Sequence, residues 1–166
     1  MTQLHDESPA ARRDAAFALG QLGPAAQGAA PELAKLLQDP DAGVRRSAAS
    51  ALVGLGPAGQ DAVPELAKLL KDPDADVRGP AAFTLGQIGP AAQDTAPELA
   101  RLLKDPHKDV RGSAASALDQ LGPAAQGAAP ELARLLKDPD ADVQRAAAYA
   151  LAEIAEGLSD KNEQGS

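Results

Sequence analysis

The sequence of 166 residues lacks cysteine and tryptophan, and aromatic residues make up only 2% of it. Without cysteine there is no disulfide framework, no thiolate nucleophile and no cysteine-based metal site, and the redox compartment stays open. The sequence also has no apolar run of about 18 residues, the minimum for crossing a membrane as a helix. Because leucine and alanine supply most of the apolar content, helices packed closely through small side chains are favoured over strands.

Positive charge is also scarce, since 16 Lys and Arg residues face 24 Asp and Glu residues and the net charge is -8. An acidic surface repels a phosphate backbone, so we expect no nucleic-acid partner. The N-terminal stretch MTQLHDES has no basic region followed by an apolar run, so no signal peptide is visible. We therefore expect no membrane partner and take a cytoplasmic location as the default.

What the sequence does contain is a repeat with a period of 33 residues. Three landmarks recur in fixed phase, namely a Gly-Pro pair, a Pro-Glu-Leu triplet and an Asp-Pro pair. They begin at Gly23, Gly56, Gly89 and Gly122, at Pro31, Pro64, Pro97 and Pro130, and at Asp39, Asp72, Asp105 and Asp138. Self-similarity at this period indicates a solenoid, in which each unit buries its apolar face against its neighbours. A solenoid presents its function on a surface rather than in an enclosed pocket.

The landmarks also suggest how the chain is divided. We expect a flexible N-terminus over residues 1–8, one solenoid over residues 9–156 and a disordered tail over residues 157–166. Residues 1–8 match no part of the repeat as we align it, and the tail is polar and aperiodic. The solenoid consists of a half-repeat and four full repeats, at residues 9–22, 23–55, 56–88, 89–121 and 122–156.

Each unit predicts two helices. In the first full repeat, the first helix covers about residues 25–38, where Leu33, Leu36 and Leu37 follow the i, i+3, i+4 spacing of one helix face. Pro31 lies early in this segment. Because proline is tolerated in a first turn and kinks a helix later, this helix either starts near Ala30 or bends at Pro31.

The second helix of this repeat covers about residues 41–55, and its apolar stripe consists of Val44, Ala48, Leu52 and Leu55. Either Asp39 or Asp41 can cap its N-terminus with a side-chain oxygen. Gly56 is expected to end it in a left-handed conformation, and Pro57 prevents continuation. The predicted fold is therefore all-α, an α-solenoid of about 4.5 helix-turn-helix repeats.

The second half of the unit reads V-R-x-x-A-A-x-x-L-G-x-I-G-P, carried in one repeat by Val77-Arg78, Ala81-Ala82, Leu85-Gly86 and Ile88-Gly89-Pro90. This pattern resembles the HEAT repeat family, in particular the short HEAT-like repeats of phycobilisome lyase subunits. The resemblance covers about residues 9–156 and implies a right-handed superhelix whose second helices line the concave side. It says little about function, because HEAT arrays serve as scaffolds, adaptors, transport receptors and a few enzymes.

The resemblance also implies a structural ladder of arginines and aspartates. In the family, the arginine of the Val-Arg pair typically bonds an aspartate of the turn between the two helices, here in the column of Asp39 or of Asp41. The arginines are Arg12, Arg45, Arg78 and Arg111, and the first aspartate column is Asp39, Asp72, Asp105 and Asp138. Gln144 replaces the last arginine and His107 replaces one aspartate of the second column. We therefore expect the ladder to weaken towards the C-terminus.

The positions that differ between repeats gather on one face of the second helices. Every aromatic residue falls in a single column, in which Phe17, Phe83 and Tyr149 alternate with Ser50 and Ser116. Aromatic and arginine side chains are the commonest anchors of protein interfaces. We therefore predict a concave strip that binds a protein or peptide, formed by Arg13, Phe17, Gln21, Arg46, Ser50, Phe83, Gln87, Ser116, Gln120, Arg145, Tyr149 and Glu153. The alternative is that the aromatic side chains only fill space between adjacent helices.

These patterns favour a non-enzymatic interaction scaffold or adaptor, with no catalytic residue, no cofactor and no metal. Iron-binding hydroxylases built from HEAT-like repeats carry His-Glu pairs, whereas neither His5 nor His107 is followed by glutamate. HEAT-like DNA glycosylases need a basic concave face, which an acidic chain does not favour.

Two alternative functions stay open. A bilin lyase-like subunit shares the repeat, although three aromatic residues offer little to hold a tetrapyrrole. A designed or consensus repeat scaffold with no natural partner is suggested by the near identity of residues 23–45 and 122–144, whereas the irregular Pro80 and His107 favour a natural origin. Because the half-repeat leaves its helix flanked on one side only, weak end-to-end self-association is a further expectation.

Overall fold

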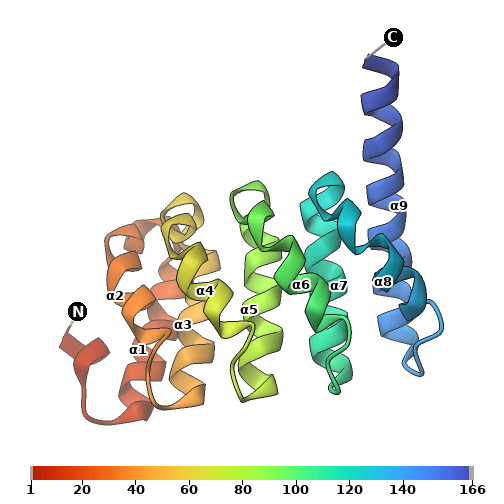
Figure 1. Ribbon diagram of the computed structural model, residues 1–166. Coiled ribbons are helices and arrows are strands. Elements are labelled where there is room, and N and C mark those ends of the chain that lie inside the picture. The colour runs from red at the N-terminus through yellow and green to blue at the C-terminus, as the bar shows by residue number, and fades with distance from the viewer. Residues whose placement is uncertain (1, 165–166) are drawn as a thin grey trace.

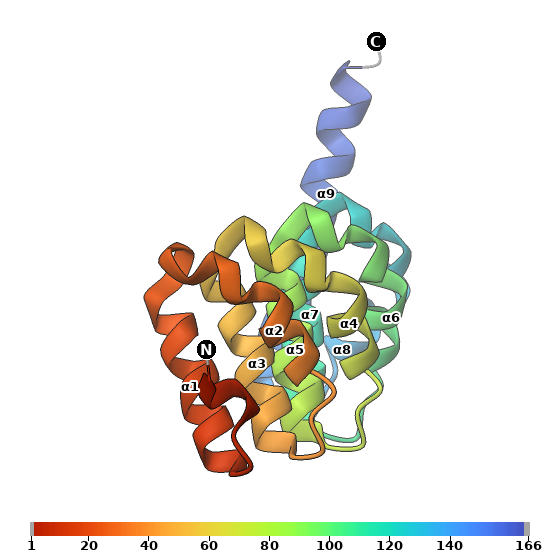
Figure 2. The same ribbon diagram turned by 90° about the vertical axis from the view of Figure 1, so that its left-hand side faces the viewer.

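The computed structural model describes residues 2–164, and within this range every regular element is a helix (Figure 1). The second helices of the repeats form one row, which consists of α1 (Pro9–Leu22), α3 (Ala42–Gly54), α5 (Ala75–Ile88), α7 (Lys108–Leu121) and α9 (Ala141–Gln164). The first helices form the other row, which consists of α2 (Ala30–Leu36), α4 (Val63–Leu69), α6 (Ala96–Leu102) and α8 (Ala129–Leu135). The predicted all-α solenoid is confirmed. Seen from the N-terminal end, successive helix pairs lie one behind another (Figure 2).

A short 3-10 helix precedes each first helix, so the single helix expected over residues 25–38 is two elements. The 3-10 helices are η2 (Gly23–Ala29), η3 (Gly56–Ala62), η4 (Gly89–Thr95) and η5 (Gly122–Ala128). In the first full repeat α2 begins at Ala30 and Pro31 lies in its first turn. Of the two alternatives, the start near Ala30 is therefore confirmed, because the missing N–H of Pro31 costs no hydrogen bond in the first turn.

Both aspartates of the inter-helix turn take part in starting α3. Asp41 is the N-cap, and its carboxylate accepts a hydrogen bond from the Val44 N–H at 3.0 Å. Asp39 accepts from the Asp41 N–H at 2.9 Å and so holds the turn in shape. From the sequence, either residue could be the cap. In the structure Asp41 caps α3 and Asp39 stabilises the turn before it.

The glycine after each second helix has the positive φ that the sequence predicts, with values of 61, 62, 71 and 54° at Gly23, Gly56, Gly89 and Gly122. The ψ of Gly23 is -142°, however, so this turn lies outside the left-handed helical region. A side chain would be strained there, and glycine is required all the same.

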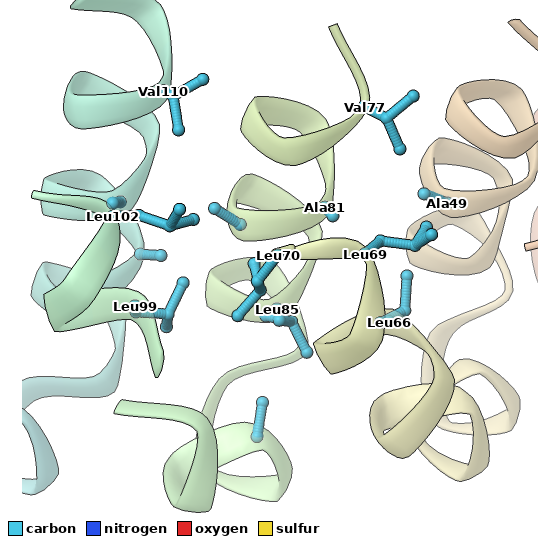
Figure 3. Packing of buried hydrophobic residues seen from close by; sticks show 14 of the residues in the cluster. Ala49, Leu66, Leu69, Leu70, Val77, Ala81, Leu85, Leu99, Leu102 and Val110 are labelled. Atoms are coloured by element: carbon cyan, nitrogen blue, oxygen red, sulfur yellow. The ribbon is translucent and has the colours of Figure 1, made fainter. Parts of the chain in front are cut away.

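An apolar core runs without interruption between the two rows. Figure 3 shows its central part, where Leu66 and Leu69 of α4 lie between the second helices α3 and α5. Leu66 is fully buried, as are its equivalents Leu33, Leu99 and Leu132. Only the ends are open, since Leu22 is 62% exposed and Leu136 is 44% exposed where no further repeat covers them.

Residues 2–8 differ from the flexible, unmatched segment expected over residues 1–8, and Met1 lies outside the described residues. Residues Thr2–His5 form the 3-10 helix η1, and Leu4 is only 1% exposed within the core. Leu4, Asp6 and Ser8 stand 33 residues before Leu37, Asp39 and Asp41. The Asp6 carboxylate accepts from the Ser8 N–H, as Asp39 does in the next turn. The array therefore begins with the end of a first helix, a relationship that sequence analysis missed because the Asp-Pro pair is replaced by Asp-Glu.

The C-terminal end also differs from the expected tail over residues 157–166. Helix α9 continues to Gln164 and projects beyond the other second helices (Figure 1). The earlier second helices are each followed by a Gly-Pro pair, and no such pair follows Glu156, so nothing in the sequence stops the helix. The last two residues of the expected tail lie outside the described residues. In the part of the chain that the structure describes, no helix is both long and apolar enough to span a membrane.

Candidate functional site

The aromatic side chains of the predicted strip point out of the stack. Phe17, Phe83 and Tyr149 are 62%, 50% and 63% exposed. They lie on α1, α5 and α9, on the face of the second helices that does not contact the first helices; we call it the second-helix face. A role confined to filling space between helices would require much lower exposure.

Two grooves on this face contain the aromatic side chains. The N-terminal groove has a volume of about 380 Å³ and lies on α1, α3 and α5, where its lining residues are Phe17, Gly20, Gln21, Arg46, Ser47, Ser50, Ala51 and Pro80. The C-terminal groove has a volume of about 490 Å³ and lies on α5, α7 and α9 with the adjoining turn, where its lining residues are Phe83, Lys108, Asp109, Gly112, Ser113, Ser116, Asp140, Asp142, Val143, Arg145, Ala146 and Tyr149.

The alternation of aromatic residues and serines explains why grooves exist here. In the C-terminal groove the small Ser116 of α7 lies between helices that carry Phe83 and Tyr149. In the N-terminal groove Ser50 of α3 has the same place between Phe17 of α1 and Pro80 of α5. A serine between two larger side chains leaves a hollow, so each groove takes residues from three successive second helices and the pattern recurs every second repeat.

The same two-repeat alternation governs how closely the second helices approach. A Cβ atom added to Gly20 would lie 2.8 Å from the Cα atom of Ala51, and one added to Gly86 would lie 2.7 Å from that of Ala117. Helices α1 and α3, and likewise α5 and α7, therefore touch backbone to backbone. Bulkier residues occupy these positions between α3 and α5, namely Val53 and Thr84.

Thr84 is buried in this wider contact, with 1% of its surface exposed. Its hydroxyl donates a hydrogen bond to the backbone oxygen of Ala49 at 3.2 Å. The Thr84 side chain thus fills the contact between α3 and α5, and its hydrogen bond to Ala49 satisfies the buried hydroxyl.

The ladder arginines each join two repeats. Arg45 donates from Nε and Nη2 to the Asp72 carboxylate at 2.7 and 2.9 Å, and from Nη1 to the backbone oxygens of Asp39 and Pro40. Both charged side chains are almost buried, at 13% and 5% exposed. The equivalent pairs are Arg12 with Asp39, Arg78 with Asp105 and Arg111 with Asp138. Bidentate pairing of this kind fixes the angle between neighbouring repeats as well as their contact.

The expected weakening of the ladder towards the C-terminus is wrong as far as Asp138. Arg111 makes the same bidentate pair as the earlier arginines, at 2.7 and 2.9 Å. His107 does not weaken the ladder, because the arginines pair with the first aspartate column and the His107 N–H still donates to Asp105. It does leave α7 without the side-chain cap that Asp41 gives α3. Gln144 retains part of the arginine's role, since its amide donates to the backbone oxygen of Asp138.

These contacts lower the pKa of Asp39 and of Asp138. The hydrogen bond from Arg111 lowers the pKa of the Asp138 carboxyl and outweighs the opposite effect of burial. Burial is the largest influence on Asp39 and would raise its pKa, but the bonds from Arg12 and from the Asp41 N–H together lower it. These two carboxylates therefore stay charged further into acidic solution than an ordinary aspartate.

The structure brings together most, but not all, of the predicted strip. The predicted residues that line neither groove are Arg13, Gln87, Gln120 and Glu153. Sequence analysis missed the residues that begin α7 and α9, above all Lys108 and Asp142. Asp142 stands one helical turn before Arg145, and Lys108 stands one turn before Gly112, which has the repeat position of Arg145, so the periodicity could have found both. Within residues 2–164 no cluster of three or more histidine or acidic residues could hold a metal ion.

A sequence profile for HEAT repeats matches residues 1–78 and 63–152. No curated protein matches the chain.

Solved structures with the same fold include natural and engineered proteins. An engineered protein has a TM-score of 0.81 at 30% identity, with 93% of this chain and 77% of that chain covered. The complex of CpcE and CpcF of phycocyanin lyase from Nostoc sp. PCC7120 has a TM-score of 0.82 at 29% identity, with 93% of this chain covered. This chain spans only 63% of that lyase chain. A designed armadillo repeat protein in complex with the peptide (KR)4 has a TM-score of 0.76 at 23% identity, covering 92% and 79% of the two chains, which shows the fold alone.

Proposed function

The chain belongs to the HEAT repeat family, and we propose that it is a non-enzymatic scaffold or adaptor that binds a partner protein or peptide on its second-helix face. The observation that carries this proposal is the exposure of Phe17, Phe83 and Tyr149 at the edges of two grooves. Large apolar side chains gathered on one face are unfavourable in water and are typical of interaction sites.

The grooves suit an extended segment better than a small molecule. Both are open hollows on the same row of helices, and they are two repeats apart. Helices in contact lie about 8 to 10 Å apart, so the grooves are separated by about 20 Å, a distance that six residues of an extended chain span. A segment lying across the second helices can thus place one side chain in each groove.

The comparisons support a partner of protein chemistry. Of the solenoids similar in fold, one is in complex with a peptide and another is part of a two-protein complex. Binding along the second-helix face of this chain is our proposal, and it is argued from the grooves and their exposed aromatic side chains.

The proposal is tested with Phe83→Ser, which copies the sister residues Ser50 and Ser116. The probe is a phage-displayed library of random peptides of about 12 residues, long enough to reach both grooves at about 3.3 Å per residue. We expect the native chain to select peptides whose affinity falls about tenfold or more with Phe83→Ser, as at an interface anchor. Leu136→Ser is the control, because Leu136 is 44% exposed and lies at the C-terminal end of the array.

Two results would contradict the proposal. The first is that no peptide is selected. The second is that the selected peptides bind Phe83→Ser unchanged while its melting temperature falls, which would assign the aromatic column to packing.

A lyase-type subunit is the second candidate, favoured by the likeness to the CpcE and CpcF complex. Absorption spectra of the purified chain mixed with a free bilin test it, since a bound tetrapyrrole shifts its visible band. A designed or consensus scaffold with no natural partner is the third candidate, and the likeness to an engineered protein agrees with it.

We also propose weak end-to-end self-association, because Leu22 and Leu136 are exposed at opposite ends of the stack. Light scattering over a concentration series tests this, with Leu136→Glu as the variant that should keep the chain monomeric. A constant monomer mass for the native chain at every concentration would show that it does not self-associate.

A further inference from the structure

We propose, on the basis of the proposed function, that the N-terminal groove binds an acidic side chain of the partner segment, whose carboxylate Arg46 receives. The groove offers apolar walls at Phe17 and Pro80 and one charged group, the Arg46 guanidinium. The expected partner is an extended peptide segment with an aspartate or glutamate next to an apolar residue.

The first argument is a comparison between repeats of the chain. Arg145 stands at the same repeat position as Arg46, and it donates to the Asp142 carboxylate at 2.6 Å within its own helix. The position of Asp142 is occupied in α3 by Gly43, so α3 offers Arg46 no such partner. Among the described residues, no ion pair or side-chain hydrogen bond involves Arg46. The N–H groups of its guanidinium are thus available to donate to an external carboxylate.

The absence of a carboxylate at Gly43 also leaves Arg13 of the neighbouring helix α1 without an acidic partner at this position. A Cβ atom at Gly43 would lie 3.6 Å from Cδ and Nη1 of Arg13, so this arginine of α1 passes directly over the glycine. Arg13 approaches only the exposed Asp14, with 3.9 Å between Nε and Oδ1. The start of α3 therefore carries two arginines with weak or no internal neutralisation.

The C-terminal groove is different in charge. Its cations are already paired, Lys108 with Asp140 at 2.9 Å and Arg145 with Asp142. Asp109 adds a further negative charge to the lining. An acidic side chain is therefore repelled at this end and attracted at the other, which gives a bound segment one orientation.

The chemistry of arginine defines the ligand further. A guanidinium binds a carboxylate through two parallel hydrogen bonds, and such charge-assisted bonds are about twice as strong as neutral ones. Because the chain as a whole has a net charge of -8, an acidic segment is not attracted to the rest of the surface. Selectivity for the acidic residue must therefore come from the contact with Arg46 itself.

The variant that tests this inference is Gly43→Asp, which supplies Arg46 with the carboxylate that Arg145 already has. The variant should fold, since Asp76, Asp109 and Asp142 occupy this position in the other full repeats. A Cβ atom at Gly43 would lie 3.0 Å from the carboxylate of the cap residue Asp41. In α5 the equivalent residues are Asp76 and the cap Asp74, and there the Asp76 N–H donates to the Asp74 carboxylate at 2.8 Å, so both aspartates fit.

The experiment uses the peptides selected by the native chain from the random library. One peptide is synthesised in two forms, with its acidic residue and with the matching amide, and both are titrated against the native chain, Gly43→Asp, Arg46→Gln and Arg134→Gln. Arg134 is a control because it is an exposed arginine of α8, in the other row of helices. We expect the acidic form to bind the native chain and Arg134→Gln about tenfold more tightly than the amide form, the effect of one charged hydrogen bond. The difference should vanish in Gly43→Asp and Arg46→Gln.

The outcomes separate this inference from the proposed function. If selected peptides need Phe83 but show no preference for an acidic residue, or keep it in Arg46→Gln, the inference is wrong and the scaffold function stands. If no variant selects any peptide, the proposed function fails and takes the inference with it.

Discussion

A single arginine side chain on α5 joins this helix to the turn before it and to the turn of the next repeat. Arg78 donates two hydrogen bonds to the Asp105 carboxylate in the next repeat, and its Nη1 donates to the backbone oxygens of Asp72 and Pro73 in its own. Surface ion pairs contribute little, but this guanidinium and its carboxylate are 12% and 6% exposed. Removing one member leaves a charge buried without a partner, which is the costly case.

We therefore predict that Arg78→Ala lowers the free energy of unfolding by about 2 to 4 kcal/mol. Arg78→Lys should recover only a part, because an ammonium group cannot make the bidentate pair. Urea unfolding followed by circular dichroism measures both values. The matched control is Arg101→Ala, whose pair with Glu98 is 3.8 Å long and mostly exposed, and which should cost less than about 1 kcal/mol. An equal loss of unfolding free energy in Arg78→Ala and Arg101→Ala would show that the ladder pair stabilises the fold no more than a surface ion pair.

The sequence predicted the members of this ladder through a family resemblance but left its partner column open. Asp39 and Asp41 are two residues apart in one turn, and spacing alone does not say which of them an arginine 27 residues earlier reaches. The planar geometry of the guanidinium decides, since only the first aspartate aligns with both Nε and Nη2. The error at His107 has the same origin.

At the scale of whole helices, small residues determine how closely neighbours pack. The backbones of α5 and α7 meet at Gly86, where an added Cβ atom would lie 2.7 Å from the Cα atom of Ala117. A Cβ atom added to Gly112, inside α7, would make only an ordinary van der Waals contact, at 3.8 Å from Cγ2 of Val143. The two glycines therefore respond differently to the same substitution.

We predict that Gly86→Ala destabilises the fold by about 1 to 3 kcal/mol, because the helices must separate to admit the methyl group. Gly112→Ala should stabilise it by up to about 1 kcal/mol, the helix propensity that alanine gains over glycine. Thermal unfolding of both variants beside the native chain is sufficient. Stabilisation by Gly86→Ala would contradict the backbone contact between α5 and α7.

The elements themselves were predictable to different degrees. The second helices were, because each has an apolar stripe, three of the five begin at an aspartate cap, and all but α9 are followed by a Gly-Pro pair. The 3-10 turns before Pro31 and its equivalents were not, since alanine and glutamine fit a 3-10 and an α-helix equally well. The grooves were partly predictable, because the aromatic column was visible, whereas their depth depends on which neighbours are serine and how closely the helices approach.

At the scale of the whole molecule, the ladder makes stability depend on pH. The pKa values of Asp39, Asp105 and Asp138 are lower in the folded chain than the ordinary value of 3.8. A carboxylate whose pKa is lowered by folding stabilises the fold fully above its unfolded pKa, and this contribution is lost as the pH falls through the folded pKa.

We therefore predict a free energy of unfolding that changes little between about pH 7 and pH 5 and falls steeply below about pH 4. Denaturant titrations at a series of pH values measure it. Asp119 provides an internal contrast, because burial raises its pKa in the folded chain. Asp119→Asn should stabilise the fold at neutral pH and lose that advantage in acid. A chain that is equally stable at pH 3 and pH 7 would be inconsistent with the ladder as described.

The alternation of close and wide contacts between second helices has a consequence for how such an array can grow. Because one groove takes an aromatic residue, a serine and a second large residue from three successive helices, the natural increment is a doublet of repeats and not a single one. Inserting one 33-residue unit would set two aromatic rows or two serine rows next to each other and close or merge a groove. Inserting two would add a further groove of the same kind and lengthen the segment that the chain can read.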